Sequence, residues 1–446
     1  MRFSELDGAS IGVWGAGLEI RSLAGQLARR LPTARIAVAA FDGPPPTDVH
    51  DALRAPGVRL VTGVEAPAAF ADCDVVVRSP GVSTHRPELC ALRARGIPVT
   101  TATGLWLAER AGRGVIGVTG TKGKSTTAAL VFHLARAAGQ EVHLAGNIGT
   151  PALDLLDLAP AAIAVVELSS YHIADLTTGP EVAVITNLFR EHADWHGSEE
   201  AYRADKLRII GLPGVRGTVV NAREERLAAA AVAAEEVWLY GLPGGWDVVS
   251  DGLALRGQLV LANAELPLPG GHNALNLCAA LAALEASGVA LPALPEALLG
   301  FQALPHRLET LSEHAGVLWV NDSISTTPES TLAALASFPG REIVLIGGGQ
   351  DRGQDYTGLA RALAERGATV IGLPSTGPRL LAAARAGGVA ASRTIDAPDM
   401  TSAVAVARTL ARPGSVVLLS PAAPSYDHYA NFEERGERFR ALAGSD

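Results

Sequence analysis

A glycine-rich turn between an apolar run and an apolar helical pattern is the feature that most constrains this chain. Residues 117–127 read Gly-Val-Thr-Gly-Thr-Lys-Gly-Lys-Ser-Thr-Thr, and helical periodicity continues through Ala128–Ala137. Such a turn presents backbone N–H groups to an anion at a helix N-terminus. We therefore expect a nucleotide-phosphate site formed by Gly120, Thr121, Lys122, Gly123, Lys124, Ser125 and Thr126.

Two kinds of side chain in this turn suit the chemistry of a triphosphate. Lys124 is expected to reach the β- and γ-phosphates, and the hydroxyl of Ser125 or Thr126 is expected to hold Mg²⁺. The usual pattern has glycine five residues before Gly123, whereas this chain has Val118. The alternative is an ordinary strand-to-helix turn, but the order of strand, turn and helix favours the phosphate site.

Length and composition indicate a globular protein of several domains. The chain has 446 residues, 48% of them hydrophobic and 19% charged, which predicts two or three domains with ample core. Its net charge of −9 argues against nucleic acid as a partner. Cys73, Cys90 and Cys278 show no CxxC spacing and read as buried apolar thiols in a reducing compartment, not as disulfides or a zinc site. We expect a cytoplasmic monomer with neither a signal peptide nor a membrane-inserted segment.

Three α/β regions are predicted, at 1–112, 113–304 and 305–446. The first begins with a strand, a Gly-Ala-Gly turn at 15–17 and a helix, which is a βαβ beginning. Ile20 occupies the third glycine position of the dinucleotide fingerprint, so a Rossmann-like turn without NAD is favoured. Ser79 lies in a polar turn at the end of a later strand, where ligands bind in α/β sheets.

Polar residues follow the strands of the central region. Glu167 ends one strand, His192 follows another, and Lys206 lies on the next helix. A carboxylate and an imidazole near a triphosphate suit Mg²⁺, which must neutralise charge during phosphoryl transfer. Each also has an ordinary interpretation, as a surface acid, a loop histidine or a solvated lysine.

The third region has polar turns at several strand ends. Arg307 suits a phosphate through its fork of donors, and Asp322 suits a ribose hydroxyl. A glycine turn at 347–353 and a segment around Ser425 also follow strands. These turns predict a ligand-facing edge of the third sheet.

Nine motifs in a fixed order give the chain a family resemblance. They lie at 120–126, 146–149, 167–171, 187–192, 202–206, 272–274, 306–309, 321–323 and 431–436. This order resembles the Mur ligases of peptidoglycan synthesis, most closely the MurD type, over essentially the whole chain. The resemblance implies a three-domain, ATP-dependent amide ligase that uses Mg²⁺, whose N-terminal, central and C-terminal domains bind the UDP moiety, ATP and the amino acid. The substrates it implies are UDP-N-acetylmuramoyl-L-alanine and glutamate.

The resemblance also implies roles for matching positions. Lys124, Lys206 and His192 are the catalytic group, with Lys206 carbamylated, and Ser125, Glu167 and His192 are the metal ligands. Asn273, Arg307 and Asp322 hold the nucleotide. The substrates are bound by Ser79, Asn147, Thr326, Arg352, Ser425 and Phe432.

Departures from the MurD pattern bear on the stereochemistry of the glutamate. Ile324 and Arg352 stand where lysines face the carboxylates of D-glutamate in ligases of that type. Ile324 cannot pair with a carboxylate. Inverting the α-carbon of glutamate moves its α-carboxylate. We therefore expect L-glutamate as the substrate and an epimerase that acts on the product. The alternative is a D-glutamate enzyme in which Arg352 compensates. The uracil turn is also altered, to Asp-Gly-Pro at 42–44, so uracil contacts are not transferred.

Two further functions are compatible with the phosphate-loop motif. Folylpolyglutamate synthase shares the Gly-Thr-Lys-Gly-Lys loop and adds glutamate, but enzymes of that type lack the N-terminal domain that carries Ser79. A nucleotide-dependent switch or transporter ATPase would hydrolyse ATP without an acceptor. Assays with and without the UDP-linked substrate distinguish these functions.

Overall fold

The computed structural model describes residues 1–42, 53, 57–189, 193–302 and 304–444. Two compact units are present. Unit 1 comprises Met1–Leu266 and Ala274–Leu299, and unit 2 comprises Pro267–Asn273 and Gly300–Asp446. None of the helices within these described ranges is long and apolar enough to cross a membrane.

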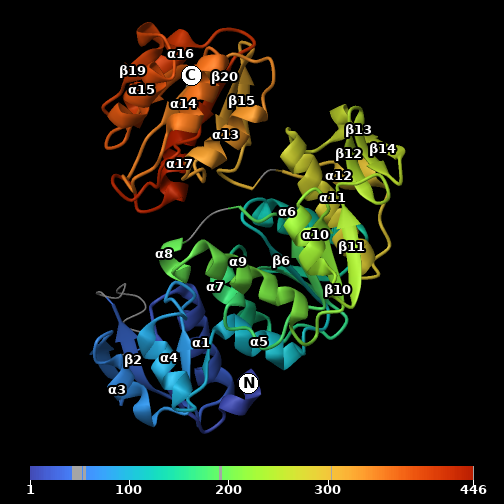
Figure 1. Ribbon diagram of the computed structural model, residues 1–446, viewed down its shortest axis with the longest axis vertical. Coiled ribbons are helices and arrows are strands. Elements are labelled where there is room, and N and C mark those ends of the chain that lie inside the picture. Colours follow the sequence, from blue (N-terminus) through green and yellow to red (C-terminus); the bar gives the residue numbers. More distant parts are fainter. Residues whose placement is uncertain (43–52, 54–56, 190–192, 303, 445–446) are drawn as a thin grey trace. The chain divides into compact units, whose positions relative to one another are not determined.

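The first sheet of unit 1, which contains the strand labelled β2 in Figure 1, has five parallel strands in the order β3-β2-β1-β4-β5. The central strands β1 and β4 are buried, largely apolar runs, as expected where both faces of a parallel sheet are covered, whereas the edge strand β3 is mostly exposed. The strands are β1 Ser10–Trp14, β2 Arg35–Phe41, β3 Arg59–Thr62, β4 Val75–Arg78 and β5 Val99–Thr100. The helices are α1 Leu18–Arg30, α3 Ala66–Ala69, α4 Pro87–Ala94 and α5 Ala102–Arg110.

The second sheet of unit 1 has six parallel strands in the order β11-β10-β9-β6-β8-β7. Strand β6, which precedes the glycine-rich turn, is central in this sheet. The strands are β6 Val115–Thr119, β7 Val142–Gly146, β8 Ile163–Glu167, β9 Val182–Ile185, β10 Gly217–Asn221 and β11 Glu236–Tyr240. The helices are α6 Lys124–Ala137, α7 Ser170–Ile173, α8 Ala193–His196, α9 Glu199–Leu207, α10 Glu225–Ala231, α11 Gly271–Ala286 and α12 Leu294–Leu298.

One hydrophobic core joins the two parallel sheets of unit 1. The cluster includes Val77 of the first sheet, Val166 and Ile185 of the second, and Trp106 of α5. Trp106 is fully buried, and its indole N–H donates to the Leu155 carbonyl at 3.2 Å. This shared core explains why both sheets belong to a single compact unit.

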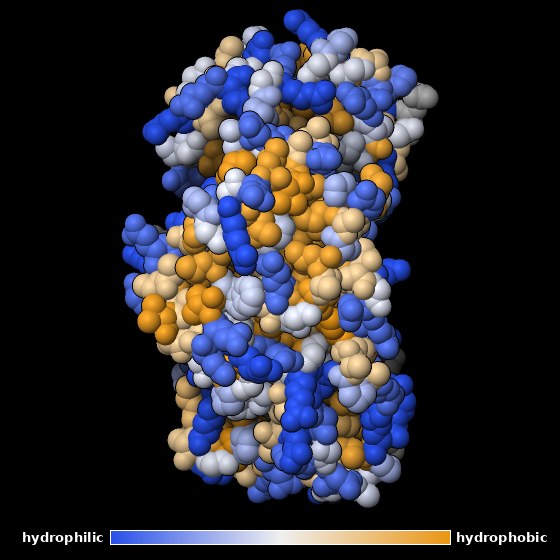
Figure 2. All heavy atoms as spheres, turned by 90° about the vertical axis from the view of Figure 1, so that its right-hand side faces the viewer, coloured by the Kyte–Doolittle hydropathy of each residue, from blue (hydrophilic) through white to orange (hydrophobic). Residues whose placement is uncertain are grey.

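A three-stranded antiparallel sheet completes unit 1. It consists of β12 Trp246–Val249, β13 Gly252–Leu255 and β14 Gln258–Ala262. Leu259 and Val260 of β14 and Val237 and Leu239 of β11 are exposed. Figure 2, seen from the side on which Figure 1 labels these strands, shows hydrophobic side chains among hydrophilic ones on this face.

Unit 2 contains a six-stranded sheet in the order β15-β16-β20-β17-β18-β19. Strand β15 is antiparallel to β16, and the remaining pairs are parallel. Separate apolar clusters cover its two faces. The strands are β15 Glu309–His314, β16 Val317–Asn321, β17 Ile343–Gly347, β18 Thr369–Gly372, β19 Thr394–Asp396 and β20 Val416–Leu419. The helices are α13 Pro328–Ala336, α14 Thr357–Glu365, α15 Gly377–Ala386, α16 Met400–Leu410 and α17 Phe432–Ala443.

The α/β class with three parallel-strand sheets is confirmed. The sequence pattern predicts a short strand at 237–240 within an irregular stretch at 214–269, whereas the structure joins this strand, β11, to the second parallel sheet. The sequence pattern predicts a helix over 199–210, but α9 ends at Leu207 and a 3₁₀ turn at Arg208–Gly211 follows it. The predicted domain boundaries at 112/113 and 304/305 stay predictions.

Candidate nucleotide and ligase site

The glycine-rich turn connects β6 to α6, at the carboxyl end of the sheet, as the sequence predicts. Gly120 has a φ of +139°, and a Cβ there would lie 1.9 Å from Thr186 Oγ1. Gly123 has a φ of +82° and caps the N-terminus of α6. Both positions need glycine because of their left-handed backbone and because of close neighbours, since a Cβ at Gly123 would lie 2.3 Å from Asn276 Oδ1.

The segment that follows β9 holds the turn in place. Thr186 Oγ1 donates to the Lys122 carbonyl at 2.6 Å, and Asn187 Nδ2 donates to the same oxygen at 3.0 Å. Asn187 Oδ1 accepts from the Lys122 N–H at 2.8 Å, and the Asn187 carbonyl accepts from the Thr121 N–H at 2.9 Å. The sequence motif does not reveal these contacts, since their partners lie more than 60 residues apart.

Lys124 is the first residue of α6, and its side chain extends back toward the turn. Its Nζ donates to the Thr121 carbonyl at 2.9 Å. Ser125 and Thr126 lie buried in the first turn of the helix, where N–H groups and the helix dipole favour an anion. This arrangement suits a phosphate chain.

Lys206 of α9 reaches the same turn. Its side chain is buried, with only 2% of the residue exposed, and Nζ donates to the Gly120 carbonyl at 2.8 Å. Nζ also lies 3.4 Å from Thr119 Oγ1 and 5.1 Å from the centre of the Tyr202 ring. The structure therefore brings Lys206 and the phosphate loop together, as the motif order predicts.

Glu167 ends β8, the strand next to β6, and is 1% exposed. Within the described ranges its Oε2 has no hydrogen-bond partner, while Oε1 accepts from Asn147 Nδ2 at 3.5 Å. A buried carboxylate oxygen without a partner is costly, and a hard cation such as Mg²⁺ would satisfy it. The residues present thus fit a magnesium ion. The third predicted metal ligand, His192, lies outside the described residues.

Ser79 lies at the carboxyl end of β4 and braces the glycine turn of the first sheet. Its Oγ accepts from the Gly17 N–H at 2.9 Å. Gly15, with a φ of +103°, lies so close that an added Cβ would be 2.5 Å from Ser79 Cβ. The two turns form one structure at this edge, and the predicted role of Ser79 in substrate binding stays a prediction.

Sequence reasoning missed the buried neighbour of Ser79. Arg78 is fully buried and forms an ion pair with Asp175. Its guanidinium also donates to the carbonyls of Val82 at 2.9 Å and Tyr171 at 2.6 Å. Burial lowers the pKa of Arg78, although the nearby Asp175 carboxylate opposes this shift. An arginine at the end of an apolar strand is the sequence feature that could have indicated this buried network.

A second buried polar chain connects α1 to α7. Glu19 Oε1 lies 2.9 Å from His172 Nε2, and His172 Nδ1 lies 2.7 Å from Ser169 Oγ. Burial raises the pKa of Glu19, but the Coulombic attraction and hydrogen bond of His172 and the contacts with Thr103 outweigh it, so the pKa is lowered. This series of hydrogen-bonded side chains fixes the first sheet against the second within unit 1.

In unit 2, Asp322 follows β16 and accepts hydrogen bonds at both carboxylate oxygens. Oδ2 accepts from Ser325 Oγ at 2.5 Å and from Ser420 Oγ at 2.9 Å, and Oδ1 accepts from the Leu308 N–H at 3.1 Å. Burial raises the pKa of Asp322 to about 6, although these hydrogen bonds and the charge of Arg307 oppose the shift. The predicted contact of Asp322 with ribose stays a prediction.

Arg307 lies in a turn with unusual backbone geometry. Its neighbours His306 and Leu308 have φ values of +62° and +44°, which non-glycine residues rarely adopt. Such strain clusters at functional sites. His272, which precedes Asn273, has its pKa lowered by burial and then by the charge of Arg307. Arg307 is thus electrostatically coupled to both His272 and Asp322 within unit 2.

The predicted amino-acid-binding residues of unit 2 come from four segments, which follow β16, β17 and β20 or begin α17. Ile324 and Thr326 are half-buried after β16, Ser425 is buried after β20, and Phe432 is half-buried at the start of α17. The Phe432 carbonyl accepts from Ser323 Oγ at 2.8 Å, which joins α17 to the β16 turn. Arg352 is exposed, with its guanidinium carbon 5.9 Å from the centre of the Tyr426 ring.

The family models match most of the chain. A model described as "Mur ligase middle domain" matches residues 118–284, and one described as "Mur ligase, glutamate ligase domain" matches residues 306–423. The first covers the phosphate loop, and the second covers most of the unit 2 sheet.

Curated relatives are similar over their full length. The UDP-N-acetylmuramoyl-L-alanine–L-glutamate ligase of Salinispora tropica is 44% identical, with 98% of each chain covered. The protein of the same name from Xanthomonas euvesicatoria pv. vesicatoria is 40% identical, with 100% of this chain and 97% of the relative covered.

Solved structures of lower identity share the fold. The MurC ligase of Thermotoga maritima has a TM-score of 0.60 at 19% identity and covers 98% of this chain and 100% of its own. The folylpolyglutamate synthase of Mycobacterium tuberculosis has a TM-score of 0.56 at 20% identity and covers 76% of this chain and 93% of its own. Full-length relatives at 40–44% identity, two family models and the observed fold agree, and the chain belongs to the Mur ligase family.

Proposed function

We propose that this protein is an ATP-dependent ligase that joins L-glutamate to UDP-N-acetylmuramoyl-L-alanine in peptidoglycan precursor synthesis. The observation that carries the proposal is the full-length identity of 40–44% to ligases named for that reaction. The phosphate loop between β6 and α6 supplies the ATP site that such a reaction needs.

The reaction requires activation of a carboxylate, because its leaving group would otherwise be oxide. Transfer of the γ-phosphoryl group of ATP to the alanyl carboxylate gives an acyl phosphate and ADP. The glutamate amine then attacks the acyl carbon, loses a proton and releases phosphate as the amide forms. Lys124 and the N–H groups of the loop stabilise the negative charge that develops during transfer.

Mg²⁺ is the proposed metal, held by Ser125 and by the partnerless carboxylate oxygen of Glu167. When bound, it would neutralise phosphate charge. His192 is a further proposed ligand on the basis of its motif alone.

Lys206 is proposed to carry a carbamate. An unmodified ammonium would repel a neighbouring cation, whereas addition of CO₂ gives an anionic oxygen ligand. The position of Nζ, 2.8 Å from the Gly120 carbonyl, puts this side chain at the phosphate loop.

The glutamate pocket is proposed to lie in unit 2, among Thr326, Ser425, Phe432 and Arg352. Arg352 is a cation available for a carboxylate, while Ile324 offers none. Asn147 and Ser79 are proposed to contact the UDP-linked substrate, and Asn273, Arg307 and Asp322 the nucleotide. If the peptidoglycan contains D-glutamate, the L-glutamate residue must be inverted after ligation. We therefore further propose an epimerase that acts on the product.

The decisive test compares both glutamate enantiomers with ATP and UDP-N-acetylmuramoyl-L-alanine. We expect ADP release only when all three substrates are present, and a kcat/KM for L-glutamate at least about tenfold above that for D-glutamate, since one misplaced carboxylate costs about 1.4 kcal/mol or more. ADP release without the UDP-linked acceptor would indicate an ATPase. A preference for D-glutamate would leave the ligase activity intact but refute the stereochemical assignment.

A further inference from the structure

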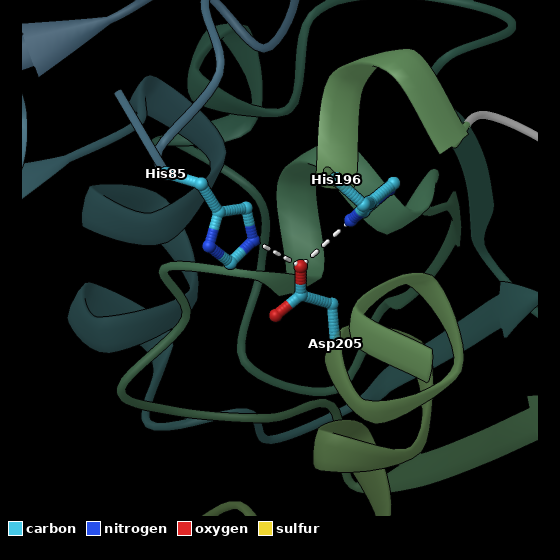
Figure 3. Close-up of side chains that lie close together, drawn as sticks. All are labelled: His85, His196 and Asp205. Carbon is cyan, nitrogen blue, oxygen red and sulfur yellow. Dashed lines mark hydrogen bonds and ion pairs between the residues drawn. The ribbon is translucent and has the colours of Figure 1, made fainter. Parts of the chain in front are cut away.

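A group of metal-binding side chains in unit 1 lies outside the sites described above (Figure 3). His85 comes from the turn between β4 and α4, His196 ends α8, and Asp205 lies on α9. Asp205 Oδ2 lies 2.5 Å from His85 Nε2 and 2.7 Å from His196 Nδ1. We propose that these three residues bind a divalent transition-metal ion, for which Zn²⁺ has the best-matched chemistry.

The donor set selects the type of metal. Two imidazole nitrogens and one carboxylate oxygen are typical Zn²⁺ ligands, whereas Mg²⁺ prefers oxygen ligands in an octahedral arrangement. This site is therefore chemically different from the magnesium site proposed at Glu167. It also differs from the cysteine-based zinc sites that the spacing of the three cysteines excludes.

The distances lie close to those of a coordinated ion. Tetrahedral ligands at about 2.0–2.1 Å from Zn²⁺ lie about 3.3 Å from one another. The ligand atoms of the three residues all lie within 4.8 Å of one another. To reach that spacing, Asp205 Oδ2 would move away from each nitrogen by under about 1 Å, and the two imidazole rings would turn toward the ion.

Neighbouring groups support the two buried ligands. His196 Nε2 lies 2.9 Å from Ser170 Oγ, which leaves Nδ1 directed at Asp205. Such a partner on the second ring nitrogen is the usual support for a metal-binding histidine. The ring of Trp195 lies 4.4 Å from that of His196 and 5.8 Å from that of His85, and forms an apolar wall. The side chain of His85 is 40% exposed, so water can reach a fourth coordination position.

The ion would connect two parts of unit 1. His85 lies in the turn that follows β4 of the first sheet, while Asp205 directly precedes Lys206 on α9. A bound ion would therefore fix the turn at His85 against the helix that delivers Lys206 to the phosphate loop.

The test uses the full-length chain, freed of metal by a chelator and kept in saturating Mg²⁺ so that oxygen-rich sites are filled. Zn²⁺ is titrated against a chromophoric chelator, and Co²⁺ is used for visible absorption. We expect one Zn²⁺ per chain and a Co²⁺ spectrum typical of four-coordinate nitrogen and oxygen ligands. His85→Ala should weaken Zn²⁺ binding by about tenfold or more and abolish that spectrum.

His143→Ala is the matched control, because the His143 side chain is 41% exposed and lies on β7, away from the group. It should leave the Zn²⁺ affinity unchanged. Asp205→Asn provides a second test, since it removes the ionised oxygen while keeping the side-chain shape. The proposal is overturned if the wild-type chain binds no Zn²⁺ under these conditions, or if both His85→Ala and Asp205→Asn bind it as tightly as the wild type. The group would then be only a hydrogen-bonded bridge between imidazoles.

Discussion

At the scale of the residue, two lysines of unit 1 have proposed catalytic roles. Lys124 and Lys206 approach the phosphate loop from α6 and from α9, and each bonds a carbonyl of that loop. Lys206 is proposed to act through a carbamate, whereas the Thr121 carbonyl positions the Lys124 ammonium to face the phosphates. Preorganised charge of this kind is the largest contribution in many enzymes.

Lys124→Ala should reduce kcat by about 10²–10³-fold, since one preorganised donor to developing charge contributes about 3–4 kcal/mol. Coupled ADP-release kinetics measure the effect, and circular dichroism confirms folding. Turnover within about twofold of the wild type would contradict the assignment of the phosphate loop.

Lys206→Ala should also be inactive, and small carboxylates such as formate should restore part of the activity by supplying an anionic oxygen. Intact-mass measurement under CO₂ and activity with added formate check this prediction. An unmodified lysine in a fully active, CO₂-depleted enzyme would show that the carbamate is unnecessary.

At the scale of the element, the connection between β16 and α13 depends on a buried acid. Asp322 accepts from Ser325, Ser420 and the Leu308 N–H, and burial raises its pKa to about 6. An aspartate in the unfolded chain has a pKa of about 3.9. At a pH between these two pKa values, Asp322 is protonated in the folded chain and ionised in the unfolded chain.

The free energy of unfolding attributable to Asp322 should therefore fall as the pH rises from about 4 to about 6 and be constant above that range. The total loss is on the order of 3 kcal/mol. Urea unfolding of the wild type and Asp322→Asn, measured at several pH values, gives the difference. The wild type should lose stability relative to the variant over this range, and a constant difference would show that the pKa is not raised.

Elements differ in how well the sequence predicts them, and two neighbouring strands show why. Strand β16 is recognisable because it is a short apolar run between polar turns. Its partner β15, Glu309–His314, is polar and at the sheet edge, so no apolar run marks it. The phosphate loop was predictable because its residues are consecutive. The bonds from Thr186 and Asn187, the Arg78–Asp175 pair and the group at His85 depend on tertiary folding, which local spacing does not encode.

The whole molecule consists of two compact units with separate apolar cores. Unit 1 holds the phosphate loop and the proposed metal ligands, while unit 2 holds Arg307 and the proposed glutamate site. Because the net charge of the chain is −9, an anionic ligand needs local cations at its site, as proposed for Lys124 and Arg352.

Mg²⁺ and ATP should raise the unfolding temperature of the chain, because a ligand that binds only the folded state stabilises it. At 100 times Kd the gain is about 2.7 kcal/mol. Calorimetry with and without Mg²⁺–ATP measures it, and Lys124→Ala should lose most of the gain. An equal shift in that variant would place nucleotide binding elsewhere.

The closeness of Gly120 to Thr186 has an evolutionary consequence. With 1.9 Å between a Cβ at 120 and Thr186 Oγ1, any side chain at 120 meets the hydroxyl that anchors Lys122. Removing the Thr186 hydroxyl would relieve that clash but also remove the anchor, and a φ of +139° would still strain any side chain at 120, so neither position can mutate first without loss. We therefore expect epistasis between these two sites: in laboratory selections for ligase activity, replacements at 120 should be recovered only alongside changes at 186, and rarely even then.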